Sequence, residues 1–327
     1  MSIHRTVSIV VPAFNREHLL PKTIKSVLNQ SYDAWELIIV DDGSTDDTVN
    51  VIKGYASKDD RIIIKSRDRL PKGAPTCRNI GMGMAKGDYL MYLDSDDTLE
   101  PYCLERRVRY MEKNSHLDYS IWNVLSVFKD GTTKVWNDLN LKDDLKSFLL
   151  ARGWQTSSSF FKRDFVKDFE WDENACSWQD WEFHIRILLA NTNYDKNPKS
   201  EPDVFIDRTP TARISSSNRS PIRIECLLRL FEKIERLLKA KGKHDYIENL
   251  KAPWYSFLEV SAVELDQKNF RKFLSIFKNA GVHRYVARPK LILSYLKLQN
   301  TLRKRHLTFL QFIPYRFMKY YGEQNWL

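Results

Sequence analysis

The chain has 327 residues, of which 43% are hydrophobic and 29% are charged, a balance that excludes an intrinsically disordered protein. Its formal net charge is +10, yet 13 Lys or Arg and no Asp or Glu lie between residues 268 and 321. The positive charge therefore belongs to the C-terminal segment, and without a recognition motif it does not indicate a nucleic-acid-binding protein.

The spacing of the cysteines and the hydropathy of the chain indicate the cellular compartment in which the protein is expected to work. The cysteines form no C-x-x-C pair, which favours a reducing, cytoplasmic environment over a disulfide framework or a structural zinc site. The N-terminus passes into a strand pattern without the apolar core of a signal peptide. No uninterrupted apolar stretch approaches the length that spans a bilayer. The four cysteines are Cys77, Cys103, Cys176 and Cys226.

The first hundred residues alternate strand and helix patterns. Strands are predicted at 7–11, 37–40, 62–64 and 89–93. Helices are predicted at 17–29, from Thr45 or Asp46 to Ile52, and at 75–85. This alternation predicts an α/β fold with a mainly parallel sheet and helices on both faces. Ligands of such sheets bind beyond the carboxyl ends of the strands.

Three of these strands end in polar or acidic segments. Residues 12–15 are Pro-Ala-Phe-Asn, residues 41–44 are Asp-Asp-Gly-Ser, and residues 94–97 are Asp-Ser-Asp-Asp. Right-handed crossovers would gather these ends along one edge of the sheet. The three carboxylates of residues 94–97 repel one another, and Mn²⁺ or Mg²⁺ would relieve that repulsion through oxygen ligands. Taken singly, each segment also fits a solvated turn or a helix cap.

The middle of the chain carries further elements. A helix with Leu104, Val108 and Met111 on one face is followed by a predicted hairpin formed by 120–128 and 132–136. Residues 153–161 are predicted to form a loop followed by a strand. Asp180 is predicted to open a helix. Three tryptophans in this region could stack on a sugar ring or fill the core: Trp154, Trp178 and Trp181.

A composition change near residues 215–221 divides the chain. We expect a nucleotide-binding domain over 1–217 and a helical, basic region over 218–327, because apolar residues from Ile224 to Leu238 recur at helical spacing. The basic tail fits two interpretations. Its amphipathic segments could pack on the catalytic domain, or they could attach the protein peripherally to an anionic membrane.

Four motifs in this order closely resemble the bacterial, inverting family 2 glycosyltransferases of the GT-A fold. They are the strand running into residues 12–16, Asp41-Asp42-Gly43-Ser44, Arg78-Asn79, and Asp94-Ser95-Asp96-Asp97. The resemblance covers about the first 215 residues. It implies a transferase with a DXD motif that moves a sugar from a nucleotide-diphosphate sugar, with a uridine nucleotide favoured, to a hydroxyl of a glycan or lipid-linked acceptor.

The resemblance also implies roles for individual residues. Asp180 matches the general base, and Asp96 with Asp97 matches the binding site of Mn²⁺ or Mg²⁺. Positions that contact the donor are Pro12, Phe14, Asn15, Asp41, Asp42, Arg78, Asp94, Ser95 and Arg213. Two positions depart from the family pattern: Gln179 stands where Glu normally precedes the base, and Ser215 stands where many relatives carry His.

These residue types are suited to the transfer of a sugar from a diphosphate to a hydroxyl. A cation and an arginine stabilise a leaving diphosphate, and one carboxylate on the opposite side of the sugar accepts the proton of the attacking hydroxyl. One base and a single displacement imply inversion. Two alternatives stay open: a nucleotidyltransferase, which the lack of a Gly-rich phosphate loop disfavours, and a non-catalytic binder of nucleotide sugars or glycans. We expect a cytoplasmic protein, at the inner face of the cell membrane if the tail binds lipid.

Overall fold

A computed structural model of the chain describes residues 5–136, 139–190, 192–197, 200–208 and 221–250. The chain forms two compact units. The first consists of Met1–Asp144, Arg152–Ala175 and Gln179–Thr211. The described part of the second consists of residues 145–151, 176–178 and 221–250.

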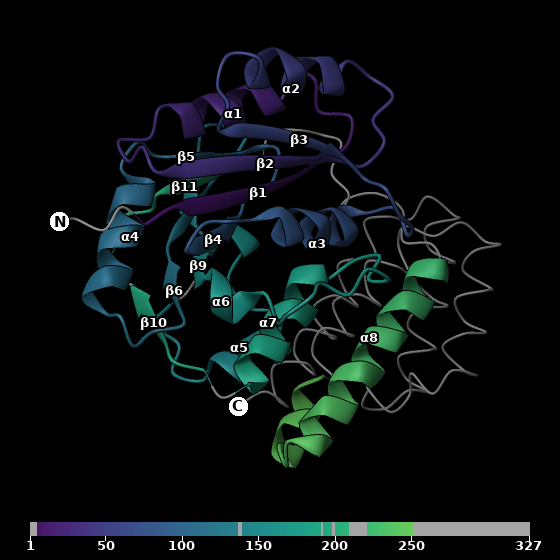
Figure 1. Ribbon diagram of the computed structural model, residues 1–327. Helices are drawn as coiled ribbons and strands as arrows, with labels where there is room; N and C mark the ends of the chain where they lie inside the picture. Colours follow the sequence, from purple (N-terminus) through teal and green to yellow (C-terminus); the bar gives the residue numbers. More distant parts are fainter. Residues whose placement is uncertain (1–4, 137–138, 191, 198–199, 209–220, 251–327) are drawn as a thin grey trace. The chain divides into compact units, whose positions relative to one another are not determined.

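A seven-stranded sheet forms the centre of the first unit (Figure 1). Its order is β10-β6-β9-β4-β1-β2-β3, and every neighbouring pair is parallel except those that β9 makes with β4 and β6. The mainly parallel sheet predicted from the sequence is confirmed. The strands are β1 (Val7–Ala13), β2 (Trp35–Asp41), β3 (Ile62–Ser66), β4 (Tyr89–Tyr92), β6 (Tyr119–Trp122), β9 (Ser159–Lys162) and β10 (Tyr194–Asn197).

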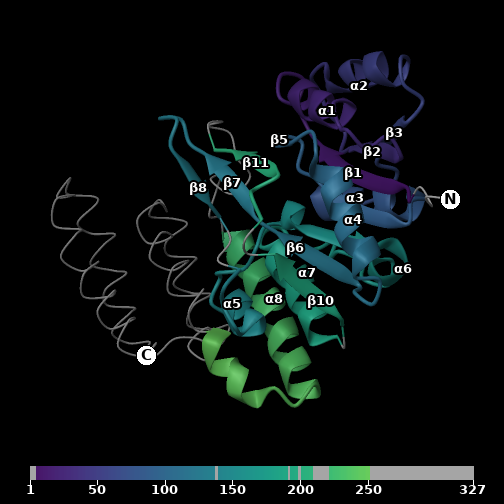
Figure 2. The same cartoon turned by 90° about the vertical axis from the view of Figure 1, so that its left-hand side faces the viewer.

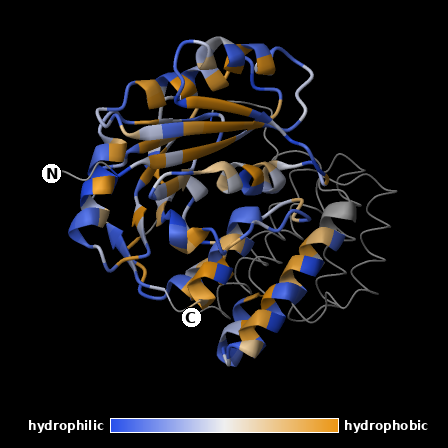
Figure 3. Ribbon diagram, viewed as in Figure 1, coloured by the Kyte–Doolittle hydropathy of each residue, from blue (hydrophilic) through white to orange (hydrophobic). Residues whose placement is uncertain are grey.

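Helices cover both faces of the parallel strands, as predicted. Figure 1 shows α1 (Leu20–Leu28) and α2 (Thr48–Ala56) on one side and α3 (Ala74–Met84) on the other. All seven residues of β1 are therefore buried, and its strand is mostly orange in Figure 3. Gly81 of α3 lies against Val10 of β1, where an added Cβ would be 2.4 Å from Val10 Cγ1. Glycine thus allows α3 to approach the sheet closely.

The register of the parallel strands aligns their carboxyl ends. Ala13 of β1 is paired with Asp41 of β2, which is paired with Ser66 of β3. The next residues continue these bonds, because Asp42 N donates to Ala13 O over 2.8 Å. The loops after these strands therefore begin at one edge of the sheet, as the sequence predicted.

A smaller sheet of order β5-β11-β7-β8 completes the first unit (Figure 2). The hairpin prediction is correct only in its second half: β7 and β8 pair antiparallel. Residues 120–128 do not form one strand, because the chain breaks at Asn123 and β6 joins the large sheet instead. The buried Asn123 side chain donates to Ser200 O over 2.8 Å at this break. The strands are β5 (Asp97–Leu99), β7 (Val124–Val127), β8 (Thr133–Val135) and β11 (Val204–Asp207).

The remaining helical segments follow the sequence closely. The predicted helix around Val108 is present as α4, and its apolar face is buried in the core. The predicted loop and strand over 153–161 are present as a short 3₁₀ turn followed by β9. These segments are α4 (Cys103–Lys113), α5 (Asp144–Leu149), η1 (Thr156–Ser158), α6 (Arg163–Val166) and α7 (Gln179–Leu189).

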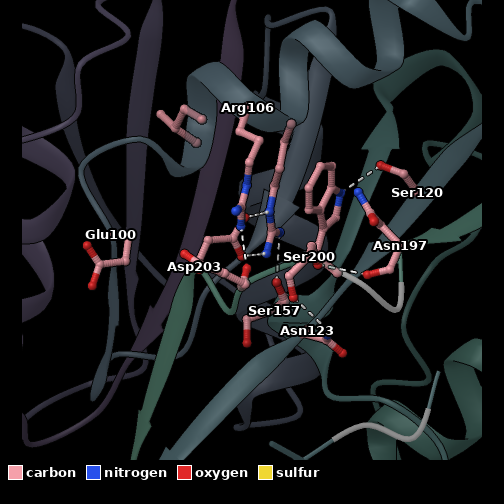
Figure 4. Close-up of polar contacts among 12 residues, drawn as sticks. Glu100, Arg106, Ser120, Asn123, Ser157, Asn197, Ser200 and Asp203 are labelled. Carbon is pink, nitrogen blue, oxygen red and sulfur yellow. Dashed lines mark hydrogen bonds and ion pairs between the residues drawn. The ribbon is translucent and has the colours of Figure 1, made fainter.

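A buried ion pair joins α4 to the start of β11 (Figure 4). Arg107 and Asp203 are both 0% exposed. The guanidinium donates to both carboxylate oxygens, over 2.6 and 3.0 Å, and to Ser157 O over 2.9 Å. Arg106 reaches the same carboxylate over 2.9 Å. Because Asp203 precedes β11, which pairs with β5, these bonds anchor the small sheet to α4.

Breaking this pair is expected to be costly. Asp203→Asn should lower the free energy of unfolding by about 3–5 kcal/mol, because it leaves the Arg107 charge buried without its carboxylate. Chemical denaturation measures the change. Arg109→Gln is the matched control on the same helix, since it breaks an exposed pair with Glu105 and should cost less than about 1 kcal/mol. Equal costs for the two variants would contradict the assigned role.

The second unit contains α8 (Pro221–Ala240) and the 3₁₀ segment η2 (His244–Leu250). The helix predicted around residues 224–238 is thus confirmed, and Leu227, Leu230, Phe231 and Ile234 are buried. Within the described residues, no helix combines the length and the hydropathy needed to cross a bilayer. Most of the predicted basic tail, residues 251–327, lies outside the described part of the chain.

Two cysteines meet in the second unit although 50 positions separate them. Cys176 N donates to Cys226 Sγ over 3.0 Å, and neither residue forms a disulfide. A hydrogen bond with the Cys176 side chain lowers the pKa of the Cys226 thiol to about 6. No spacing rule applied to the sequence indicated this contact.

Candidate functional site

Two adjacent carboxylates shape the loop that follows β2. Asp41, which is 3% exposed, accepts hydrogen bonds from Gly43 N over 3.0 Å and Ser44 N over 3.1 Å. Gly43 has a φ of 81°, a conformation that favours glycine. The next carboxylate, Asp42, instead accepts from Arg67 Nε over 2.6 Å and from Gly73 N over 3.1 Å. Asp41 therefore holds its own turn, whereas Asp42 ties that turn to the segments before α3.

Two cations beside this loop were missed in the sequence. Arg67 follows β3 directly, so the strand-end argument that selected Asp41 applied to it as well. Lys72 places its Nζ 3.4 Å from the centroid of the Phe14 ring. No sequence signal distinguished Lys72 from a solvated lysine. Both residues bring positive charge to the edge where the donor-binding residues were predicted.

The loop after β1 is joined to the loop after β2. Asn15 N donates to Ser44 Oγ over 2.9 Å, and Asn15 Oδ1 accepts from Thr45 N over 2.8 Å. Asn15 has a φ of 52°, which asparagine tolerates better than most residues. Pro12 is buried in β1, and Phe14 follows the strand. These three predicted residues thus lie at the same sheet edge as Asp41.

Arg78 connects α3 with the acidic loop after β4. It is only 6% exposed, and its Nη2 donates to Asp94 Oδ1 over 2.7 Å. Its Nη1 donates to Gln179 Oε1 over 3.1 Å. The guanidinium carbon lies 4.5 Å from the centroid of the Trp171 ring. Asn79 holds that tryptophan, since its side chain exchanges hydrogen bonds with both Trp171 N and Trp171 O.

The acidic loop is less open than the sequence suggested. The Asp94 side chain is 45% exposed, and Asp96 is partly buried. Ser95 is buried, and its carbonyl accepts from Thr23 Oγ1 over 3.1 Å. Asp97 is 4% exposed because it begins β5 and pairs with β11. Only two of the three predicted carboxylates are therefore accessible at this edge.

These carboxylates fit a metal site that the substrate completes. Among the described residues, no group of three His, Cys, Asp or Glu is placed to hold a metal ion. Magnesium sites of enzymes typically use one or two carboxylates together with substrate phosphates and water. Asp94 and Asp96 at the end of a parallel strand match that donor set.

The predicted helix around Asp180 is present, and it begins one residue earlier, at Gln179. Asp180 Oδ1 accepts from Trp181 N over 3.0 Å. Burial raises the pKa of Asp180, Asp94 raises it further, and Arg78 opposes both. A helix N-terminus favours an ionised carboxylate, but desolvation outweighs that effect at Asp180. The charges of Arg78 and Asp94 therefore act on Asp180, although 102 and 86 positions separate them in the sequence.

His184 lies in α7 and forms a hydrogen bond with the first turn of that helix. The residue is 1% exposed, and burial lowers its pKa to about 4, so the ring is neutral at neutral pH. Because a carbonyl can only accept, Nδ1 donates to Asp180 O over 2.8 Å and Nε2 accepts from Ser159 Oγ over 3.0 Å. His184 is thus a buried structural residue that joins α7 to β9.

The three tryptophans that could contact the sugar acceptor do not share one environment. Trp154 and Trp181 are each 5% exposed, which matches the core role that the sequence also allowed. Trp178 belongs to the second unit, where its ring centroid lies 6.0 Å from that of Phe231. Arg213 lies outside the described residues.

Sequence comparison places most of the first unit in a known family. A profile described as "Glycosyl transferase family 2" matches residues 8–175. An uncharacterized glycosyltransferase of Haemophilus influenzae is 41% identical over 161 residues, which cover 49% of this chain and 64% of that protein. The GalNAc(5)-diNAcBac-PP-undecaprenol beta-1,3-glucosyltransferase of Campylobacter jejuni is 30% identical over 51% of this chain and 55% of its own length.

Solved structures support the fold assignment. S. aureus TarS, residues 1–349 in complex with UDP-GlcNAc, superposes with a TM-score of 0.70 at 16% identity, covering 93% of this chain and 92% of that chain. The mannosyltransferase PcManGT of Pyrobaculum calidifontis, in complex with GDP-Man and Mn²⁺, superposes with a TM-score of 0.52 at 14% identity, covering 92% and 88%. At these identities the similarity establishes the GT-A fold alone.

Proposed function

Because the chain belongs to glycosyltransferase family 2, we propose that it is a metal-dependent, inverting glycosyltransferase that uses a nucleotide-diphosphate sugar. One observation carries the proposal. Arg78 bonds to Asp94 and to Gln179, and its charge acts on Asp180, so the residues expected to bind the diphosphate and to accept the proton share one site.

The proposed chemistry follows from these groups. Arg78 stabilises the negative charge that develops on the departing diphosphate, in a pre-oriented and largely dehydrated position. The half-buried Asp180 accepts the proton of the acceptor hydroxyl as that oxygen attacks the anomeric carbon. Attack from the side opposite the diphosphate inverts the configuration. A raised pKa makes Asp180 a stronger base than an ordinary surface carboxylate.

We assign divalent metal binding to the loop after β4. Asp96, assisted by Asp94, would hold Mn²⁺ or Mg²⁺ together with the diphosphate oxygens, and Asp97 would orient the loop from β5. The ion would supply Lewis-acid stabilisation of the leaving group. The PcManGT complex, which contains Mn²⁺, supports this assignment.

Donor, acceptor and location are proposed from the same sources. A uridine nucleotide is favoured, supported by the TarS complex with UDP-GlcNAc. A glycan or lipid-linked acceptor is supported by the name of the Campylobacter relative. We place the protein in the cytoplasm, at the inner membrane face if the basic tail binds anionic lipid. Residues 1–217 would form the catalytic domain, with Arg213 as a further diphosphate contact.

Slow hydrolysis of the donor tests the proposed function. With Mn²⁺, one of a panel of UDP- and GDP-sugars should raise the melting temperature and release nucleoside diphosphate. Both effects should disappear with EDTA. Exchange of pyrophosphate into the nucleotide sugar would indicate a nucleotidyltransferase instead. Stabilisation by a donor without turnover, with or without glycan acceptors, would indicate a non-catalytic binder.

A further inference from the structure

The side chain of Gln179 occupies a position between two fixed partners. Its Oε1 accepts from Arg78 Nη1 over 3.1 Å, and its Nε2 donates to Ala175 O over 3.1 Å. The carbonyl of Ala175 can only accept, so the orientation of the amide is determined. Gln179 therefore bridges the guanidinium on α3 and the turn that precedes α7.

Only an amide satisfies both partners. A glutamate at this position could accept from Arg78, but its second oxygen would face the Ala175 carbonyl with no hydrogen to donate. Two acceptors at hydrogen-bond distance repel each other, and Ala175 is itself buried. Glutamine at position 179, where the family pattern has Glu, therefore suits the carbonyl of Ala175, which requires a donor.

The amide leaves Arg78 with one bonded carboxylate partner among the described residues. Among the described residues, Asp94 is the carboxylate that bonds to this guanidinium, and its side chain is 45% exposed. Gln179 holds the guanidinium without adding a second negative charge. Each terminal nitrogen of Arg78 makes one hydrogen bond within the described part of the chain, so each retains one N–H. The guanidinium also lies over the Trp171 ring, with its carbon 4.5 Å from the ring centroid.

We propose that Gln179 is a positioning residue that orients Arg78 toward the donor diphosphate through an uncharged acceptor. The inference rests on the proposed function, and it assigns to Gln179 a contribution to donor affinity. Because Gln179 acts through Arg78, the effect falls on the diphosphate and not on the nucleoside. If Gln179 only packed at the start of α7, its substitution would not weaken diphosphate binding selectively over nucleoside binding.

Two variants with different chemistry test the proposal. Gln179→Met keeps the bulk but removes the acceptor for Arg78, whereas Gln179→Glu keeps that acceptor and adds a charge. Both variants lose the bond to Ala175 O. Calorimetry with Mn²⁺ compares UDP and GDP with uridine and guanosine. Both variants should weaken binding of the nucleoside diphosphate roughly 10-fold, with nucleoside affinity unchanged.

Donor kinetics give a second readout. Both variants should raise the KM for the donor more than they lower kcat, because Asp180 is retained. Leu188→Ala, nine residues further along α7, is the matched control and should leave the preference for diphosphate over nucleoside unaltered. Wild-type affinity for UDP and GDP in both variants would overturn the inference alone. A wild-type protein that binds neither nucleotide would overturn the proposed function together with it.

Discussion

Asp180→Asn is expected to lower kcat by roughly 10²- to 10⁴-fold, because the amide cannot accept the proton of the attacking hydroxyl. The substitution preserves size, and its side-chain oxygen can still accept from Trp181 N. Donor binding should therefore persist. Steady-state kinetics with the donor identified by hydrolysis, together with calorimetry of nucleoside diphosphate binding, separate the two effects.

The pH profile sharpens this prediction. The base works only when ionised, and burial raises the pKa of Asp180 above the usual carboxyl range. We therefore expect kcat/KM to rise with pH through that raised pKa and to fall as Asp180 is protonated below it. This limb should vanish in Asp180→Asn. Asp164→Asn, at an exposed aspartate on α6, is the control and should retain both rate and profile. Near-normal turnover in Asp180→Asn would remove Asp180 from the mechanism.

The second large effect is expected from removal of the metal ion or its proposed ligand. EDTA should abolish transfer, and Mn²⁺ or Mg²⁺ should restore it in the wild type. Asp96→Ala should lose about 10²-fold or more in kcat/KM, because Lewis-acid stabilisation of a leaving phosphate contributes several kcal/mol. Higher Mn²⁺ should recover part of the loss if Asp96 contributes affinity for the ion. Kinetics over a range of Mn²⁺ concentrations measure this dependence.

Asp60→Asn provides the control for this experiment, because Asp60 lies exposed before β3. It should show the wild-type response to Mn²⁺. Asp96→Ala with an unchanged Mn²⁺ dependence would place the ion elsewhere. Full activity of the wild type in EDTA would show that Arg78 and neighbouring groups neutralise the diphosphate without a metal.

Much of the site could be predicted because it lies at the ends of regular elements. Short continuous apolar runs located β1 to β4, helical patterns located the helices between them, and parallel sheets bind ligands at their carboxyl ends. Asp41 and Asp94 come directly after the strands predicted at 37–40 and 89–93, so the strand ends drew attention to them. Asp180 was selected through its match to the family's general base, and the helix predicted at this position begins one residue earlier. The hairpin was only half predicted, because nothing local distinguishes one strand from two that separate at Asn123.

The sequence by itself determined the order of the elements, the edge of the sheet at which the acidic loops gather, and the family of the catalytic unit. Tertiary structure alone decided which of these groups act on one another. The contacts of Arg78 with Gln179, of Asp42 with Arg67 and of Arg107 with Asp203 join residues 101, 25 and 96 positions apart. Such contacts depend on the packing of whole elements, whereas propensity and periodicity describe only neighbours along the chain. The burial of Asp97 and the raised pKa of Asp180 have the same origin, since desolvation is a property of the surrounding fold.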